Sequence, residues 1–280
     1  MTRRAYLLGQ PVAHSLSPTL HNAAFAALGI DAEYAAWDVS LDNLAEVVDS
    51  LRAEDCMGAN VTAPHKRAVL PLMDSVREEV RALGAVNTIV NNGGHLSGGN
   101  TDAEGLARWM RLSGIEVARG AAVVLGAGGA AGSAVWALSD LGASSVMVLN
   151  RSVERAQNLV TSLRPKLQEV DLTWGALEEA AEPVARPWRV VVNATSMGHH
   201  GSAPDVHPSW YSPDSVAIEL AYNPPETGFM VAARAAGARA ENGLGMLLHQ
   251  AALAFERWTG RVPPMDVYEA ALADRMRTAP

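Results

Sequence analysis

Cysteine is almost absent from this 280-residue chain: Cys56 stands alone, so no disulfide can form within the chain. Aromatic residues are also scarce, with three Phe and five Tyr. No run of about 18 apolar residues occurs, which excludes a transmembrane helix, and the apolar stretch near the N-terminus is too short for a signal peptide. These absences predict a protein of a reducing compartment, and we expect it in the cytoplasm.

Positive charge is also in short supply. Lys and Arg number 22 against 30 Asp and Glu, which gives a formal net charge of -8. No dense basic tract offers a footprint for nucleic acid or for an anionic membrane, and the histidines lack the spacing of metal ligands. We therefore expect no metal, no nucleic acid and no membrane as partners, and a small molecule bound by local donors.

Apolar residues nevertheless make up nearly half of the chain, in short strand-like runs that alternate with helical stretches. Strands are predicted near 5–8, 34–39, 56–61, 86–90, 121–126, 145–149, 189–193 and 215–220. Helices are predicted near 18–28, 41–52, 64–70, 75–83, 102–113, 130–141, 153–162, 244–258 and 265–276. This alternation is typical of an α/β protein, and the length favours two domains.

A glycine turn follows the predicted strand 121–126 and leads into a helix, in the pattern G-x-G-x-x-A. Its residues are Gly126, Ala127, Gly128, Gly129, Ala130 and Ala131. The first glycine permits a tight turn, the second lets the backbone approach a pyrophosphate, and the final Ala lets helix and strand pack closely. A purely structural turn is the alternative, because the pattern alone is not specific.

The end of the next strand, about 20 residues further on, decides between the two readings. It has the sequence Asn150-Arg151-Ser152, with Arg155 one helical turn later. NAD-selective proteins carry Asp or Glu at this position, whereas Arg and Ser suit the 2'-phosphate of NADP. Two solvated surface arginines and a helix-capping serine are the alternative. Together with the glycine turn, this strand end predicts NADP binding.

Lys66 is the first candidate for chemistry, in the segment Asn60-Val61-Thr62-Ala63-Pro64-His65-Lys66. Pro64 suits the first position of a helix, which would place Lys66 in the first turn, where the helix dipole disfavours a cation. A lysine placed there against the dipole is a candidate for proton transfer. A solvated surface lysine is the alternative.

Asp102 and the serine pair Ser15 and Ser17 are further candidates. Thr101 and Glu104 predict a capping box, which leaves Asp102 either as a complement to the helix dipole or as a site carboxylate. Ser17 precedes a proline and is predicted to be a helix N-cap, which leaves Ser15 unexplained. Two hydroxyls at this spacing can clasp a polyol.

In this order and spacing, the motifs resemble those of the shikimate dehydrogenase family over essentially the whole chain. The matching segments are 15–18 (S-x-S-P), 60–66 (N-V-T-x-P-x-K), 85–88 (A-V-N-T), 100–102 (N-T-D), 126–131, 150–152, 193–198, 222–224 and 243–250. The chain departs at Gly132, where the commonest family continuation has Arg, and this difference would alter local phosphate contacts modestly.

The resemblance implies an NADP-dependent oxidoreductase acting on a CH–OH group. It would reduce 3-dehydroshikimate to shikimate, in the pathway to chorismate and the aromatic amino acids. The implied α/β fold has an N-terminal substrate-binding domain that is completed by C-terminal helices, over 1–103 and 243–280. A Rossmann-type NADP-binding domain, 104–242, is inserted between them, and the protein would be a monomer or homodimer.

The resemblance also implies roles for individual residues. Lys66 and Asp102 would serve proton transfer at the substrate O3. The substrate's hydroxyls and carboxylate would be held by Ser15, Ser17, Asn60, Thr62, Lys66, Asn87, Asp102, Tyr222 and Gln250. The cofactor would contact Gly126, Ala127, Gly128, Gly129, Ala130, Ala131, Asn150, Arg151, Ser152, Arg155, Thr195, Met197, Gly243 and Met246. For Gln250, a solvent-facing glutamine is the alternative.

Three rival functions share part of this pattern. A quinate/shikimate dehydrogenase would tolerate an extra substrate hydroxyl and often use NAD, but Ser17, in place of a Thr, and Arg151 argue against it. A methylenetetrahydrofolate dehydrogenase would leave the S-x-S-P motif without a purpose. A catalytically silent NADP sensor requires the loss of Lys66 or Asp102, and both are present.

Overall fold

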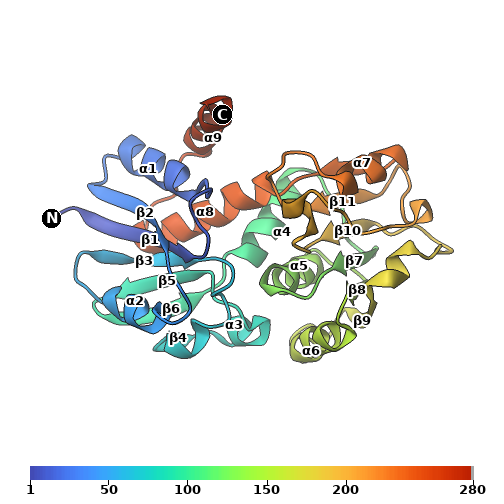
Figure 1. Cartoon of the computed structure of the whole chain (residues 1–280), viewed down its shortest axis with the longest axis horizontal. Helices are drawn as coiled ribbons and strands as arrows, with labels where there is room; N and C mark the ends of the chain where they lie inside the picture. Colours follow the sequence, from blue (N-terminus) through green and yellow to red (C-terminus); the bar gives the residue numbers. More distant parts are fainter. Residues whose placement is uncertain (279–280) are drawn as a thin grey trace. The chain divides into compact units, whose positions relative to one another are not determined.

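The protein forms two compact units, which are coloured along the chain in Figure 1. This computed structural model describes the backbone of residues 1–278 and the side chains of 1–198 and 201–277. The first unit comprises Met1–Thr101 and Leu248–Pro280, and the second comprises Asp102–Leu247. The first unit is therefore discontinuous in sequence, while the ligand that each unit binds remains a prediction.

The first unit is built on a mixed sheet with the strand order β2-β1-β3-β5-β6-β4. Its strands are β1 (Arg3–Gly9), β2 (Ala32–Asp38), β3 (Cys56–Val61), β4 (Ser75–Val76), β5 (Thr88–Asn92) and β6 (His95–Gly99). β1 is parallel to β2 and β3, whereas β5 is antiparallel to β3 and β6. Its helices are α1 (Ser17–Ala27), α2 (Leu44–Ser50), α3 (Glu78–Leu83), most of α8 (Leu244–Thr259) and α9 (Met265–Thr278). α1 packs against α9, so the C-terminal segment completes this unit.

The second unit is an all-parallel sheet in the order β12-β11-β10-β7-β8-β9, which is the Rossmann arrangement. Its strands are β7 (Ala121–Leu125), β8 (Ser145–Asn150), β9 (Asp171–Ala176), β10 (Val190–Asn193), β11 (Val216–Glu219) and β12 (Arg239–Glu241). Its helices are α4 (Asp102–Leu112), α5 (Gly129–Asp140), α6 (Val153–Leu163) and α7 (Gly228–Ala235). The strand order reverses between β7 and β10, where such sheets bind ligands.

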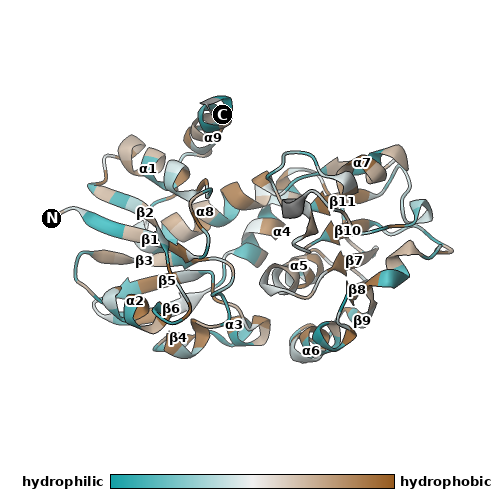
Figure 2. Ribbon diagram, viewed as in Figure 1, coloured by the Kyte–Doolittle hydropathy of each residue, from teal (hydrophilic) through white to brown (hydrophobic). Residues whose placement is uncertain are grey.

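Burial explains why these segments adopt their structures. The central strands β7 and β10 read as continuous apolar runs because parallel strands are covered on both faces. α6 instead turns Ala156, Leu159, Val160 and Leu163 inward, and Figure 2 shows it with both hydrophilic and hydrophobic colouring. This is the pattern of a surface helix with one buried stripe.

One helix prediction in the first unit is wrong, and another places its helix start too early. Residues 64–70 form turns followed by the 3-10 helix Leu70–Leu72, because the Val86 N–H donates to the carbonyl of Lys66 at 2.8 Å, which a helix would need for its own ladder. The helix predicted over 75–83 begins only at Glu78, since residues 75–76 pair with β6. The elements β6, β9, α7 and β12 were not predicted.

A β-bulge interrupts β3. Arg4 lies opposite Cys56 and Ala5 opposite Gly58, so β3 carries one extra residue here. Gly58 has a φ of +139°, and a Cβ at this position would lie 2.0 Å from the carbonyl oxygen of Ile89. The same oxygen accepts a hydrogen bond of 2.9 Å from the Trp258 indole. Glycine at 58 therefore lets β3, β5 and α8 meet at one carbonyl.

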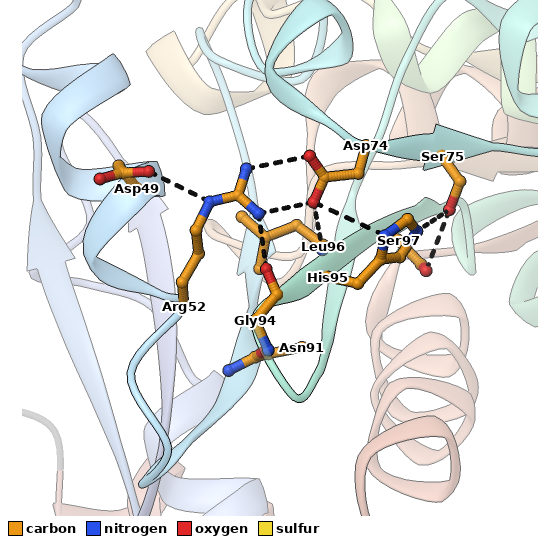
Figure 3. Close-up of polar contacts among 9 residues, drawn as sticks. All are labelled: Asp49, Arg52, Asp74, Ser75, Asn91, Gly94, His95, Leu96 and Ser97. Atoms are coloured by element: carbon orange, nitrogen blue, oxygen red, sulfur yellow. Dashed lines mark hydrogen bonds and ion pairs between the residues drawn. The ribbon is translucent and has the colours of Figure 1, made fainter.

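An ion-pair cluster in the first unit joins the residues after α2 to the β4–β6 edge (Figure 3). The Arg52 guanidinium donates to both carboxylate oxygens of Asp74, at 2.6 and 3.1 Å, and to the Gly94 carbonyl at 2.6 Å. The Leu96 N–H donates to Asp74 Oδ2 at 2.7 Å. These donors, Arg52 first, lower the pKa of Asp74 from 3.8 to about 2.

This shift predicts a pH dependence of stability. Because the folded-state pKa of Asp74 is depressed, its contribution is present above the ordinary value of 3.8 and is lost as the pH falls through about 2. We expect the free energy of unfolding, measured with urea at each pH, to fall across this range, and Arg52→Met to flatten that fall. Arg4→Met breaks another ion pair of the first unit, between the exposed Arg4 and the half-buried Asp55, and is the control. An equally flattened profile in the control would contradict the assignment to Asp74.

Candidate functional site

Gly126 lies where β7 ends, at the reversal of strand order in the second unit. It is buried and has a φ of +108°. A Cβ here would lie 2.9 Å from the Ala194 carbonyl oxygen and 3.1 Å from the Thr195 nitrogen, both in the segment after β10. The glycine therefore allows the loops that follow β7 and β10 to approach each other closely.

The start of α5 supplies the features that a pyrophosphate needs. Gly128 is its exposed N-cap residue, and a Cβ there would meet nothing within 4 Å. Among the described residues, no side chain caps this helix start, so its first-turn N–H groups can donate to an anion. Ala127 and Ala131 are buried, whereas Gly129 and Ala130 are half-buried. This open, uncapped helix start fits the pyrophosphate of a dinucleotide.

The end of β8 carries the predicted selectivity residues. Asn150 is half-buried and its side-chain nitrogen donates to the Ser152 carbonyl at 2.9 Å, which shapes the turn. Arg151, Ser152 and Arg155 are all exposed at the beginning of α6. Two guanidinium groups and a hydroxyl are thus available at one strand end for an anionic group.

A buried hydrogen-bond network supports the segment after β10. Asn193 donates to the Glu219 carboxylate at 2.8 Å and accepts from the Thr195 hydroxyl at 2.7 Å. The Thr195 hydroxyl in turn accepts from the Met197 N–H at 3.3 Å, while Thr227 donates to Glu219 at 3.0 Å. Asn193 and Glu219 are fully buried and hold two predicted cofactor residues in place. Neither was predicted from the sequence, although each is a polar residue that ends an apolar strand.

The remaining cofactor candidates of the second unit lie near the start of α8. Gly243 is buried, and a Cβ there would lie 2.1 Å from the Leu220 carbonyl oxygen. Met246, in the first turn of α8, is 8% exposed. Tyr222, which is a predicted substrate residue, follows β11 and is half-buried. The glycine thus places the start of α8 against the segment that follows β11.

The serine pair has a different local role from the one predicted. α1 begins at Ser17, and its N-cap residue is Leu16, so the prediction of Ser17 as N-cap is wrong. The Ser15 hydroxyl instead accepts a hydrogen bond of 3.2 Å from the Ser17 N–H. Ser15 therefore satisfies the N–H of the first residue of α1, which has no partner within the helix, and the Ser17 side chain is buried.

Asn60 and Asn87 lie at the ends of adjacent strands in the first unit, and both are buried. The Asn60 side-chain nitrogen donates to the Asn87 carbonyl at 3.2 Å. The side-chain oxygen of Asn87 accepts from the Thr101 N–H at 2.7 Å and from the Thr88 hydroxyl at 2.9 Å. The structure thus brings together two predicted substrate residues and fixes their amide groups.

Thr62 and Lys66 lie in the turn that follows β3, and both are half-buried. Since residues 64–69 form no helix, the prediction that Lys66 opposes a helix dipole is wrong, and its proposed role rests on the resemblance. Asp102 is the buried first residue of α4, in the second unit. Gln250, in the first unit, is 9% exposed, so the solvent-facing alternative is wrong.

Over the described part of the chain, no helix is long and apolar enough to cross a membrane. Within the same residues, no group of three or more His, Cys, Asp or Glu is placed to hold a metal ion.

Comparison with known families gives matches in three segments. Residues 7–89 match the shikimate dehydrogenase substrate binding domain, and residues 111–200 match the shikimate/quinate 5-dehydrogenase family. Residues 243–273 match the shikimate 5'-dehydrogenase C-terminal domain.

Known proteins are similar over nearly the full length. A shikimate dehydrogenase (NADP(+)) of Moorella thermoacetica is 41% identical, with 96% of this chain and 92% of the relative covered. One of Salinibacter ruber is 43% identical, with 98% of each chain covered. The structure of Thermus thermophilus shikimate 5-dehydrogenase with NADP(H) and shikimate has a TM-score of 0.85 at 38% identity, covering 97% of this chain and 99% of that one. The structure of quinate dehydrogenase of Corynebacterium glutamicum, in complex with NAD, has a TM-score of 0.89 at 30% identity. The match covers 98% of this chain and 99% of that one. Identity of this extent over both units, together with the motifs found in each, places the chain in the shikimate dehydrogenase family.

Proposed function

We propose that this protein is an NADP-dependent shikimate dehydrogenase, which reduces the C3 carbonyl of 3-dehydroshikimate to the CH–OH group of shikimate. The observation that carries the proposal is the end of β8, where Arg151 and Ser152 replace the carboxylate of NAD-selective proteins. The relatives named above as NADP(+)-dependent shikimate dehydrogenases support it. A cytoplasmic location and a monomeric or homodimeric state remain predictions.

The second unit would hold the cofactor. The N–H groups and dipole at the start of α5 would bind the pyrophosphate. Arg151, Arg155 and the Ser152 hydroxyl would donate to the 2'-phosphate. When bound, NADPH supplies the hydride for the carbonyl carbon. The other cofactor contacts that we propose are those of Asn150, Thr195, Met197, Gly243 and Met246.

The substrate is a small polyol with a carboxylate, and hydroxyl and amide side chains suit it. We assign its binding to Ser15, Ser17, Asn60, Thr62, Asn87, Tyr222 and Gln250. Lys66 would donate a proton to the oxygen that develops negative charge at C3, and Asp102 would steady the lysine ammonium by charge. One positioned acid–base group of this kind contributes about 10²- to 10⁴-fold to the rate.

Cofactor choice provides a direct test. Arg151→Ala removes a charge-assisted contact to the 2'-phosphate and should weaken NADP binding by about 1.5 to 3 kcal/mol, while NAD binding stays nearly unchanged. Titration of each cofactor against intrinsic fluorescence measures both dissociation constants. Arg186→Ala, which removes another exposed arginine of the same unit, should alter neither.

Steady-state assays of shikimate and quinate with NADP+ and NAD+ test the function itself. We expect the highest kcat/KM for shikimate with NADP+. A preference for NAD+ or for quinate would contradict the proposal and favour a quinate/shikimate dehydrogenase. The similarity to the C. glutamicum quinate dehydrogenase makes this the alternative to test.

A further inference from the structure

Tyr34, in β2, places its hydroxyl against a predicted substrate residue of another strand. The side chain is 1% exposed. Its hydroxyl donates to Asn60 Oδ1 at 2.9 Å, and both groups are buried. Asn60 belongs to β3. One buried hydroxyl of β2 therefore contacts the side chain of a substrate candidate in β3.

The direction of these hydrogen bonds follows from the Asn87 carbonyl, which can only accept. The Asn60 side-chain nitrogen donates to that carbonyl at 3.2 Å, so the Asn60 amide oxygen must face Tyr34. Tyr34 must then be the donor. Burial raises the pKa of Tyr34, so the hydroxyl keeps the proton that this bond requires. The Asn87 carbonyl and the Tyr34 hydroxyl together hold the Asn60 amide in one orientation.

Tyr34 is itself held firmly by its surroundings. The Asn22 side chain donates to the Tyr34 carbonyl at 2.9 Å and accepts from the Tyr34 N–H at 2.8 Å. The His21 ring stacks on the Tyr34 ring with centroids 4.4 Å apart, and the Trp258 ring lies at 5.9 Å. Because backbone and ring are both fixed, the hydroxyl has one defined position.

We propose that Tyr34 is a positioning residue for substrate binding, whose hydroxyl holds the Asn60 amide in the orientation in which it contacts the substrate. This inference rests on the proposed function, because Asn60 is assigned to the substrate by resemblance. Tyr34 itself needs no contact with substrate, cofactor or reacting atoms.

Tyr268 offers a matched control for a purely structural role. It is 0% exposed and belongs to the same aromatic cluster, in which its ring lies edge-on to His21 with centroids 6.1 Å apart. Its hydroxyl lies 3.3 Å from His21 Nδ1, and His21 is no substrate candidate. Tyr34→Phe and Tyr268→Phe therefore each remove one buried phenolic oxygen from the same region.

The experiment compares shikimate kinetics of the two variants. Tyr34→Phe should raise the KM for shikimate about 10-fold, as expected for a lost hydrogen bond that oriented binding groups, and should change kcat by less than about 2-fold. Its dissociation constant for NADP+ should stay unchanged. Tyr268→Phe should alter neither KM nor kcat. Adding Asn60→Ala to Tyr34→Phe should raise the KM by much less than the product of the single effects, because the two side chains act through one hydrogen bond.

The outcomes separate this inference from the proposed function. Failure of the unaltered enzyme to oxidise shikimate with NADP+ would overturn the function. With an active unaltered enzyme, an unchanged KM in Tyr34→Phe, or equal increases in both variants, would overturn the positioning role alone. A Tyr34→Phe protein that fails to fold while Tyr268→Phe folds would also overturn it, because the hydroxyl would then serve the core.

Discussion

Replacing Lys66 by methionine is expected to lower kcat for shikimate at least about 10²-fold at neutral pH, the loss typical of one positioned acid–base group. Methionine keeps most of the apolar stem, and the backbone of Lys66 is held by its own hydrogen bond from the Val86 N–H. Folding and NADP affinity should therefore survive. Saturating steady-state kinetics, a thermal melt and a cofactor titration measure the three properties separately.

The neighbouring residue provides the control, because Arg67 is an exposed cation in the same turn. Arg67→Met should leave kcat nearly unchanged. Asp102→Asn should act on the same step as Lys66→Met, so the double variant should be far less impaired than the product of the single losses. Multiplicative losses would show that the two residues are not coupled. Full kcat in Lys66→Met would leave the half-buried lysine without a role in proton transfer and shift the search for the acid to Tyr222 or a bound water.

The largest loss of stability is expected for Gly58→Ala. The new Cβ would lie 2.0 Å from the Ile89 carbonyl oxygen and 2.9 Å from the Trp258 indole nitrogen, so β3 must shift away from β5 and α8. The φ of +139° adds backbone strain for any residue with a Cβ. Strain together with a disrupted buried hydrogen bond should cost at least about 3 kcal/mol. The urea midpoint and melting temperature of the first unit measure this cost.

Gly29→Ala separates the cost of backbone strain from the cost of the close approach to Ile89. Gly29 also has a positive φ, +62°, but a Cβ there would meet nothing within 4 Å. Its alanine variant should lose only about 1 to 2 kcal/mol, the cost of the left-handed conformation. Equal losses at the two positions would mean that the close approach to Ile89 contributes nothing.

The parts of the fold that could be predicted are those whose signal is local. β7 and the start of α5 follow from an apolar run and a glycine turn, and α6 follows from a stripe of buried apolar residues. The Rossmann unit was recognisable because its glycine turn and the end of β8 have a characteristic spacing. The family motifs added a proposed role for each residue, which local patterns could not supply.

The missed features depend on contacts between residues far apart in sequence. The turn around Lys66 is set by Val86, twenty positions later, and no local pattern reports that hydrogen bond. Tyr34 reads as an ordinary apolar position of a strand until Asn60 is placed beside its hydroxyl.

The discontinuity of the first unit has a consequence for biosynthesis. During translation, residues 102–247 emerge before the segment from Leu248 onward, and all strands of the Rossmann sheet lie within them. The first unit cannot be completed until this last segment is made. The Trp258 indole then donates to the Ile89 carbonyl, and the Arg261 side chain donates to the Leu28 carbonyl. Until then, the face of α1 that α9 covers is open to water, to chaperones or to another nascent chain. The Rossmann unit can therefore begin to fold before the first unit has the C-terminal segment that completes it.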